Sequence, residues 1–243
     1  GSLAMGSFYP PKSDVDILIV AEDLSERQSQ SLYKLSERYH QARPFAGGLE
    51  VNAVRLRDAE SPRHPLPSLG RFSETTSGPS LRRDGQLPTD EDLIAHLAVS
   101  RHRGVALFGP PPSQVIGEIP WVDYTTAIAG DVRWILEDDH LTSSPCYGIL
   151  NLCRWAMIGS TDERIVPSKE EGGIWGLSNL PHSMRELVRQ ALAAYRSDAW
   201  PGSIKERQMM GGPWNRASLL SFRDEFRMRD EQHTTSRPAL RLE

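Results

Sequence analysis

The first twenty residues, GSLAMGSFYPPKSDVDILIV, constrain the fold most, because they end in a predicted strand that opens with two acidic residues. Side chains alternate between the two faces of a strand. We therefore expect Val15, Ile17 and Ile19 on one face and Asp14 and Asp16 on the other. The stretch predicts a strand over residues 14–20 that is apolar on one face and acidic at the start of the other.

Two carboxylates on one face of a strand create an electrostatic conflict. Asp14 and Asp16 are two residues apart and hence ~7 Å apart along the strand. A divalent cation between them removes their repulsion, and Mg²⁺ prefers one or two carboxylates together with phosphate oxygens. The pair is a candidate magnesium site. The alternative is a polar strand end with no role in chemistry.

Two further features favour phosphate chemistry near this strand. Gly1 allows close approach of the backbone to an anion, and successive N–H groups with the Ser2 hydroxyl can cradle a phosphate. Glu50 lies in a second predicted strand, 49–56, on the face opposite Leu49 and Val51. A phosphate cradle, a metal site and a carboxylate base are the parts that nucleotidyl transfer requires.

The rest of the chain predicts a small α/β domain followed by a helical domain. Ser25 and Gln28 form a capping box that starts a helix reaching about residue 40. Residues 58–89 are rich in Pro, Ser, Gly and charge, which is typical of a long loop. Helical patterns then cover 89–103, 123–139, 146–159, 169–178, 182–197 and, with an interruption at 211–213, 203–230. We expect an α+β chain with domains at 1–88 and 89–243, the second ending in a polar tail.

The opening stretch resembles the signature of the polymerase-β-like nucleotidyltransferases, which is GS followed after about ten residues by DxD. Within that superfamily the chain is similar to the streptomycin/spectinomycin (aminoglycoside) adenylyltransferases. Three later stretches match the helical domain of that family in the same order: YGILNLCRWAM, PSKEEGGIWGLSNLP and ELVRQALAAYRSD. The resemblance implies a nucleotidyltransferase α/β domain with a mixed sheet, followed by an all-α helical bundle.

Members of that family carry a helix and a central strand before the GS pair. Nothing in this sequence corresponds to them before Gly1, so the resemblance implies that these two elements are missing.

The resemblance also implies an activity and a set of site residues. The activity is Mg²⁺-dependent transfer of AMP from ATP to a hydroxyl of an aminoglycoside or aminocyclitol antibiotic. Asp14 and Asp16 would bind the metal, and Glu50 would share it while acting as the base. Four residues would contact the nucleotide: Gly1, Ser2, Lys169 and Tyr195.

Lys169 and Tyr195 each have a structural alternative. Ser168 and Glu171 form a capping box, which places Lys169 in the first turn of a helix. A cation there opposes the helix dipole by up to ~1 kcal/mol, whereas an anion bound at that end is favoured. An exposed lysine whose charge is offset by its acidic neighbours fits the same pattern. Tyr195 lies at helical spacing among apolar residues, which is also typical of a core position.

The substrate-binding residues are the least defined. Trp134, Asp138 and Asp139 are candidates for contact with a cationic sugar, because the resemblance implies acidic and tryptophan side chains in this region. Ser143 and Ser144 stand where an acidic residue is expected. A solvated helix end explains the two aspartates equally well, so the sequence leaves the individual antibiotic open.

Composition excludes several other classes of protein. A net charge of -4 does not indicate binding to nucleic acid, which favours a basic surface, and the printed sequence shows no apolar run of membrane-span length and no signal-peptide pattern. Cys146 and Cys153 are too far apart on a predicted helix to form a disulfide, so we expect both to be free thiols, as is usual in the cytoplasm. We also expect the enzyme to be cytoplasmic and a monomer. Two alternatives remain, a nucleotidyltransferase that modifies a protein or another small molecule, and a truncated nucleotide-binding module without catalysis.

Overall fold

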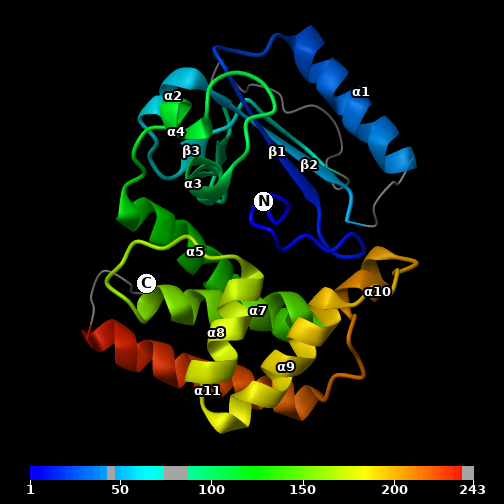
Figure 1. The fold of residues 1–243 in the computed structure, drawn as a ribbon, viewed down its shortest axis with the longest axis vertical. Helices are drawn as coiled ribbons and strands as arrows, with labels where there is room; N and C mark the ends of the chain where they lie inside the picture. Colours follow the sequence, from blue (N-terminus) through cyan, green and yellow to red (C-terminus); the bar gives the residue numbers. More distant parts are fainter. Residues whose placement is uncertain (43–46, 74–86, 237–243) are drawn as a thin grey trace. The chain divides into compact units, whose positions relative to one another are not determined.

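The computed structural model describes residues 1–42, 47–73 and 87–236, with side chains up to residue 228 in the last segment. The chain divides into two compact units, Gly1–Ala127 and Ile128–Glu243, and the division falls within helix α5 (Trp121–Leu136). Figure 1 shows strands in the first unit and helices throughout the second. The expected α+β class, with a mixed sheet followed by a helical domain, is confirmed.

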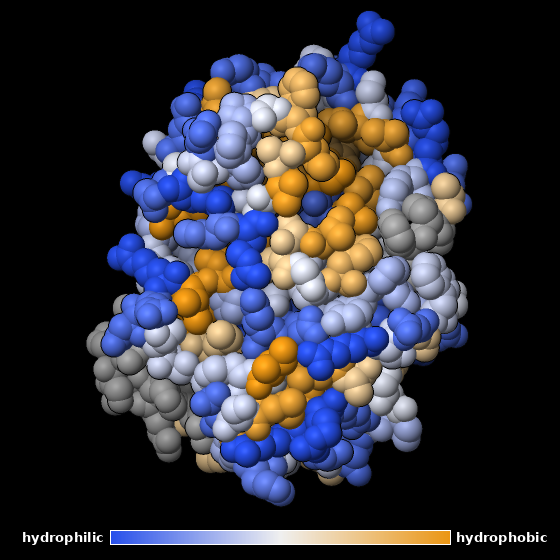
Figure 2. All heavy atoms as spheres, viewed as in Figure 1, coloured by the Kyte–Doolittle hydropathy of each residue, from blue (hydrophilic) through white to orange (hydrophobic). Residues whose placement is uncertain are grey.

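A three-stranded mixed sheet forms the centre of the first unit, in the order β1-β2-β4. Strands β1 (Val15–Ala21) and β2 (Leu49–Arg55) are parallel, and helix α1 (Glu26–Ala42) connects them. Strand β4 (Gly70–Phe72) pairs antiparallel with β2. All seven residues of β1 are half-buried, and Figure 2 shows apolar side chains gathered at the surface over this strand.

The capping box predicted for α1 is present. The Gln28 backbone N–H donates to Ser25 Oγ at 3.3 Å, and the Ser25 N–H donates to Gln28 Oε1 at 2.9 Å. These reciprocal bonds satisfy two backbone donors that a helix start leaves unpaired.

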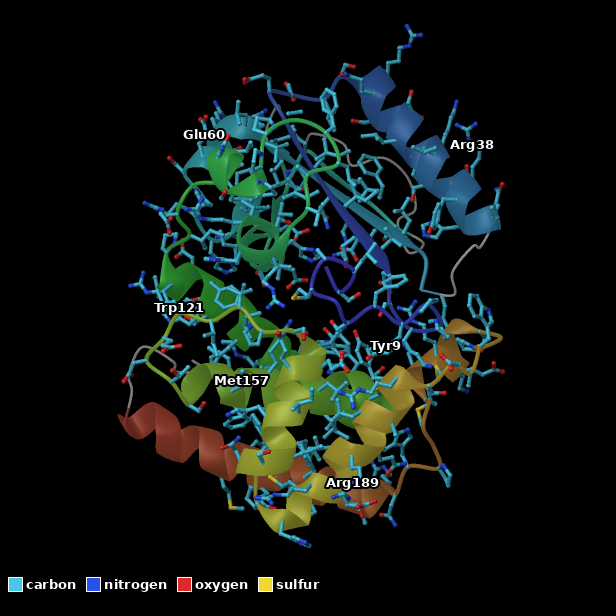
Figure 3. All side chains as sticks on the ribbon, viewed as in Figure 1. Tyr9, Arg38, Glu60, Trp121, Met157 and Arg189 are labelled. Atoms are coloured by element: carbon cyan, nitrogen blue, oxygen red, sulfur yellow. The ribbon has the colours of Figure 1, made fainter. Side chains whose placement is uncertain are left out.

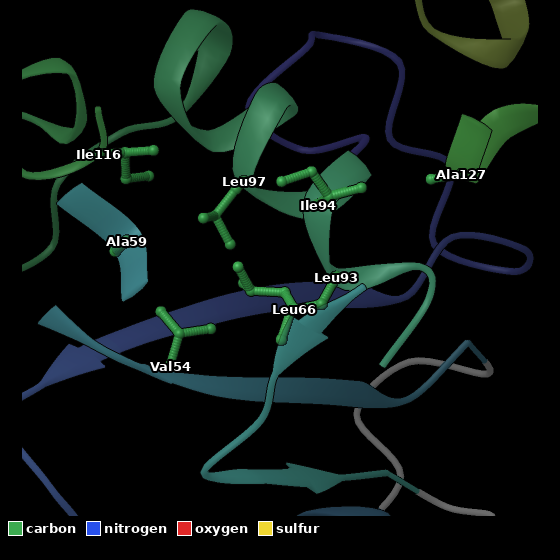
Figure 4. Packing of buried hydrophobic residues seen from close by; sticks show 8 residues of the cluster. All are labelled: Val54, Ala59, Leu66, Leu93, Ile94, Leu97, Ile116 and Ala127. Atoms are coloured by element: carbon green, nitrogen blue, oxygen red, sulfur yellow. The ribbon is translucent and has the colours of Figure 1, made fainter. Parts of the chain in front are cut away.

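The sheet has an apolar layer on each face, and the predicted alternation is confirmed. One layer combines odd-numbered residues of β1 and β2 with three side chains of α1: Leu32, Tyr33 and Tyr39. The other layer contains Leu18, Val20 and Val54 together with residues from helix α3 (Leu93–Arg103). Figure 4 shows this second cluster, whose eight labelled members are Val54, Ala59, Leu66, Leu93, Ile94, Leu97, Ile116 and Ala127.

Several short elements were not predicted. Residues 58–89 were expected to form a loop, but the described part contains the end of helix α2 (Leu56–Glu60), strand β3 (Leu66–Pro67) and β4. Strand β5 (Thr89–Asp90) pairs with β3, and helix α4 (Pro112–Val115) follows α3. Elements of two to five residues are too short for a periodic pattern, and tertiary packing fixes them instead. Residues 74–86 lie outside the described part.

The division of the chain also differs from the boundary expected near residue 88. Leu93, Ile94 and Leu97 of α3 are fully buried against Val54 of the sheet, so α3 belongs with the first unit. The boundary was expected near residue 88 because the sequence changes there from strand-rich to helix-rich. A helix that covers a sheet nevertheless shares the core of that sheet and belongs to the same unit.

The second unit is helical. It contains the end of α5 followed by α6 (His140–Ser143), α7 (Pro145–Gly159), α8 (Lys169–Asn179), α9 (His182–Arg196), α10 (Ile204–Gln208) and α11 (Arg216–Ser236). Helix α7 packs against both α8 and α9. Glycines allow α8 to lie close to α7, because a Cβ at Gly172 would be 2.6 Å from the Arg154 backbone nitrogen.

Both cysteines are buried free thiols in the α7 helix, as predicted. The Cys146 thiol donates to the Ala191 carbonyl at 3.3 Å, and burial raises the pKa of Cys153 to about 12. Along the described residues, every helix is too short or too polar to cross a membrane.

Candidate active site

The parallel register places Asp16 directly opposite Glu50 on neighbouring strands. Paired residues in a parallel sheet project from the same face, so both carboxylates lie on the face that α3 covers further along. Asp14 precedes β1 by one residue. Glu50 of β2 therefore lies on the same face of the sheet as Asp16 of β1, as the sequence predicts.

Cationic and amide groups from three elements surround the Glu50 carboxylate. Arg71 Nη2 of β4 is 3.1 Å from Glu50 Oε1, and Asn52 Nδ2 donates to the same oxygen at 3.0 Å. His96 Nε2 of α3 lies 3.9 Å away. Burial acts to raise the pKa of Glu50, but the charges of His96 and Arg71 and the hydrogen bonds outweigh it and lower the pKa. Glu50 is therefore a largely buried carboxylate that remains ionised at neutral pH.

Gly1 approaches Asp16 closely. Its nitrogen lies 3.9 Å from Asp16 Oδ2, and a Cβ built on Gly1 would be only 1.5 Å from the same oxygen. A residue with a side chain cannot occupy this position without displacing Asp16. Ser2 lies in the turn that follows, where its carbonyl accepts from the Ser7 N–H at 3.0 Å. The Gly1 backbone thus lies against the Asp16 carboxylate, and its approach to a phosphate stays a prediction.

The expected metal site is only partly assembled. Within the residues that the structure describes, no three His, Cys, Asp or Glu side chains gather in a group that could hold a metal ion. Asp16 and Glu50 are neighbours, and Asp14 does not complete a three-carboxylate set with them. Two carboxylates nevertheless fit Mg²⁺, because this ion commonly uses one or two carboxylates and takes its other oxygens from water and substrate phosphates.

A second group of candidate residues lies in the helical unit, where Lys169 and Tyr195 come together. The capping box at the start of α8 is present, with Glu171 N–H donating to Ser168 Oγ at 3.1 Å. It fixes Lys169 in the first helical turn. The Lys169 ammonium lies 6.0 Å from the ring centroid of Tyr195 and 5.3 Å from that of Tyr147. Both distances fit cation–π contact.

Two residues of α7 and one of α5 extend this cluster, and sequence reasoning missed all three. The Tyr147 hydroxyl donates to Asp131 Oδ1 at 2.8 Å, and Arg154 Nη2 lies 3.8 Å from Asp131 Oδ2. Arg154 Nε is buried and has no hydrogen-bond partner among the described residues. Tyr147 and Arg154 are seven apart and therefore share a helix face, which is the signal that could have found them.

The three candidate substrate residues have different surroundings. Trp134 is 44% exposed, and its ring stacks on His140 with centroids 4.1 Å apart. Asp139 accepts from Arg216 Nη2 at 2.8 Å, whereas Asp138 accepts from Arg223 through its carbonyl. Trp134 is thus an accessible aromatic surface, and the Asp139 carboxylate already has a cationic partner.

The first unit also contains site residues that the sequence did not single out. The alternation of side chains along a strand could have identified Asn52, because it lies two residues after Glu50 on the same face of β2. Arg71 lies in a three-residue strand and His96 in the middle of helix α3, and neither pattern predicts a partner for Glu50.

Comparisons with known proteins agree with this architecture. Residues 114–210 match the family described as aminoglycoside adenylyltransferase, C-terminal domain. The spectinomycin 9-adenylyltransferases of Staphylococcus aureus strains Mu50 and N315 are each 26% identical over 200 residues, which cover 78% of this chain and 75% of theirs. A crystal structure of a spectinomycin adenyltransferase from Enterococcus faecialis with ATP and spectinomycin has the same fold. The TM-score is 0.67 at 18% identity, over 93% of this chain and 89% of that one. The chain is therefore similar to the aminoglycoside adenylyltransferases, in sequence over the C-terminal domain of that family and in fold over most of its length.

Proposed function

We propose that the protein transfers AMP from ATP to a hydroxyl group of an aminoglycoside or aminocyclitol antibiotic. The observation that carries the proposal is the register of β1 and β2, which sets Asp16 beside a largely buried, ionised Glu50. The names of the Staphylococcus aureus relatives support an aminocyclitol as the acceptor, because spectinomycin belongs to that class.

Glu50 is the proposed base. The acceptor hydroxyl oxygen would attack the α-phosphorus of ATP, the bond to the β-phosphate would break, and pyrophosphate would leave. The proton released from the hydroxyl would pass to the Glu50 carboxylate. Arg71 and Asn52 hold this carboxylate by charge and hydrogen bonding, so they fix the direction in which it can accept a proton.

Asp14 and Asp16 are the residues proposed to hold magnesium, with Glu50 beside them. The pair Asp16 and Glu50 fits the small number of carboxylates that this ion uses, and Gly1 leaves room at Asp16 because it has no Cβ. Magnesium, when bound, would neutralise charge on the phosphates as they rearrange. The N–H groups around Gly1 and Ser2 would bind phosphate oxygens.

Lys169, Tyr195 and Arg154 are proposed to bind the triphosphate. Within the described part of the chain, the contacts of the Lys169 ammonium are aromatic rings. Its charge is therefore available to an anionic ligand. The unpaired Nε of Arg154 offers a second donor in the same cluster, and guanidinium groups bind phosphate oxygens with favourable geometry.

The acceptor antibiotic is proposed to contact the exposed ring of Trp134. Stacking on a tryptophan face suits an amphipathic cationic sugar. Asp138 and Asp139 are weaker candidates, and Asp139 would have to exchange its Arg216 partner for the antibiotic.

The proposal is tested by incubating the protein with ATP, Mg²⁺ and a panel of aminoglycosides and aminocyclitols while pyrophosphate release is measured. Release should depend on both Mg²⁺ and one or more antibiotics. Lack of release with every antibiotic would contradict the acceptor class. ATP binding in that case would favour a binding module, and AMP attached to a protein would favour a protein-modifying enzyme.

A further inference from the structure

We infer that the ion pair between Glu170 and Arg196 is a positioning pair for nucleotide binding by Lys169 and Tyr195. This inference rests on the proposed function of the Lys169 cluster and adds to it two residues that do not touch the nucleotide. Each member of the pair directly follows one of the two ligand residues in the chain.

The geometry of the pair joins the two helices at the cluster. Arg196 Nε of α9 donates to Glu170 Oε1 of α8 at 2.5 Å. The Glu170 side chain is only 13% exposed and that of Arg196 is 43% exposed. A charge-assisted bond to a largely buried carboxylate is stronger than a surface ion pair. The bond therefore connects the first turn of α8 to the last turn of α9.

The relative position of those two turns decides where Lys169 lies. Tyr195 is buried at the end of α9, so its ring is fixed by the core of the unit. Lys169 begins α8 and lies 6.0 Å from that ring. A bond between the residues that immediately follow Lys169 and Tyr195 holds this separation constant.

The pair also affects the charge available at the site. Lys169 is followed by two glutamates, either of which could offset its charge. In the capping box Glu171 accepts from the Ser168 N–H at 2.6 Å, and Glu170 accepts from Arg196. With Glu170 neutralised by Arg196, the positive charge of Lys169 remains effective toward a triphosphate.

The test compares ATP affinity among single and double variants, measured by calorimetry with Mg²⁺ present. Arg196→Ala and Glu170→Ala should each weaken ATP binding on the order of tenfold, because each removes the same bond between α8 and α9. The kcat at saturating ATP and the KM for the antibiotic should stay within about twofold of wild type. Arg196→Lys should retain most of the affinity.

The charge-swapped double variant, Glu170→Arg with Arg196→Glu, separates positioning from direct contact. If the pair positions Lys169, the swap should recover at least half of the lost affinity in logarithmic terms. If Arg196 itself binds phosphate, the swap should remain weak and Glu170→Ala should bind normally, which would overturn the inference. Arg189, labelled on α9 in Figure 3, forms an exposed ion pair with Glu186. Arg189→Ala is the matched control and should bind ATP as wild type does.

Failure of the inference can be told apart from failure of the proposed function. Wild-type binding that is lost in Lys169→Met but kept in both Arg196→Ala and Glu170→Ala would overturn the inference alone. A folded wild-type protein that binds no ATP would overturn the proposed function and the inference with it. Thermal unfolding of each variant identifies any that fail to fold, and Arg196→Lys then supplies the comparison.

Discussion

The two units contain charged clusters that are built in different ways. In the first unit, Asp16 and Glu50 lie on adjacent parallel strands, and Arg71 of β4 and His96 of α3 lie beside the largely buried Glu50 carboxylate. In the second unit, Lys169 lies over two aromatic rings contributed by α7 and α9. The first cluster thus surrounds an acid with basic and amide groups, whereas the partners of the Lys169 ammonium among the described residues are two aromatic rings.

This difference separates two chemical tasks. A carboxylate stabilised in its ionised form can accept a proton and attract a metal ion. A lysine whose described contacts are π faces keeps its charge for an incoming anion. Variants that remove the acid should therefore affect turnover, and variants that remove the cation should affect nucleotide affinity.

The largest expected effect comes from Glu50→Gln. The amide has almost the same shape and can still accept from Arg71, but it cannot take a proton from the acceptor hydroxyl. We expect kcat for pyrophosphate release to fall by about 10²- to 10⁴-fold with little change in ATP affinity.

The matched control for this variant is Glu60→Gln, because Glu60 is an exposed glutamate on α2 in the same unit (Figure 3). It should retain wild-type turnover. An undiminished kcat in Glu50→Gln would remove Glu50 from the role of base and reduce the first cluster to a structural ion pair.

Lys169→Met tests the second half of the comparison. Methionine is also an unbranched side chain of similar length, so the change removes the charge with little change in shape. Loss of a charge-assisted bond to phosphate costs about 1.5–3 kcal/mol, so the KM for ATP should rise about tenfold to a hundredfold. Lys205→Met, on the exposed face of α10, should leave the KM for ATP unchanged. Equal effects of the two variants would show that the cluster around Lys169 does not bind ATP.

The close packing that brings α8 to α7 can be tested by adding one methyl group. A Cβ at Gly172 would lie 2.6 Å from the Arg154 backbone, which cannot move without shifting α7. We expect Gly172→Ala to lower the free energy of unfolding by about 1–3 kcal/mol, measured by urea denaturation. Gly130 of α5 has open space at its Cβ position, so Gly130→Ala should be neutral or stabilise by up to about 1 kcal/mol. If both changes stabilise equally, the packing of α8 on α7 is looser than described.

The smallest effect concerns the buried thiols of the helical unit. Burial raises the pKa of Cys153 to about 12, so the reactive thiolate is scarce at pH 8. A chromogenic disulfide reagent should label neither cysteine rapidly in the native protein and both after unfolding in urea. The raised pKa also means that the stabilising contribution of the neutral thiol is present below about pH 9 and is lost as pH rises toward 12. Rapid labelling of native Cys153 at pH 8 would contradict the burial of α7 in the core.

The sequence predicted the longer helices and strands and the acidic face of β1. It did not predict the residues that contact Glu50 and Asp131. Alternation and capping boxes located β1, β2, α1 and the start of α8, because these signals are local. The pairing of Glu50 with Arg71 depends on a three-residue strand that follows β2 by a connection of 14 residues, from 56 to 69. The contacts of Asp131 with Tyr147 and Arg154 depend on helix packing, which no local pattern encodes. The metal-binding role of Asp14 remains a prediction.

The measurement that tests the account most directly is transfer of radiolabel from α-labelled ATP to spectinomycin by the wild-type protein and by Glu50→Gln. If Glu50 is the base, wild type should label the antibiotic in a Mg²⁺-dependent way, Glu50→Gln should lose nearly all labelling, and both proteins should bind ATP. Equal labelling by the two proteins would show that Glu50, which the strand register holds opposite Asp16, does not accept the proton of the antibiotic hydroxyl.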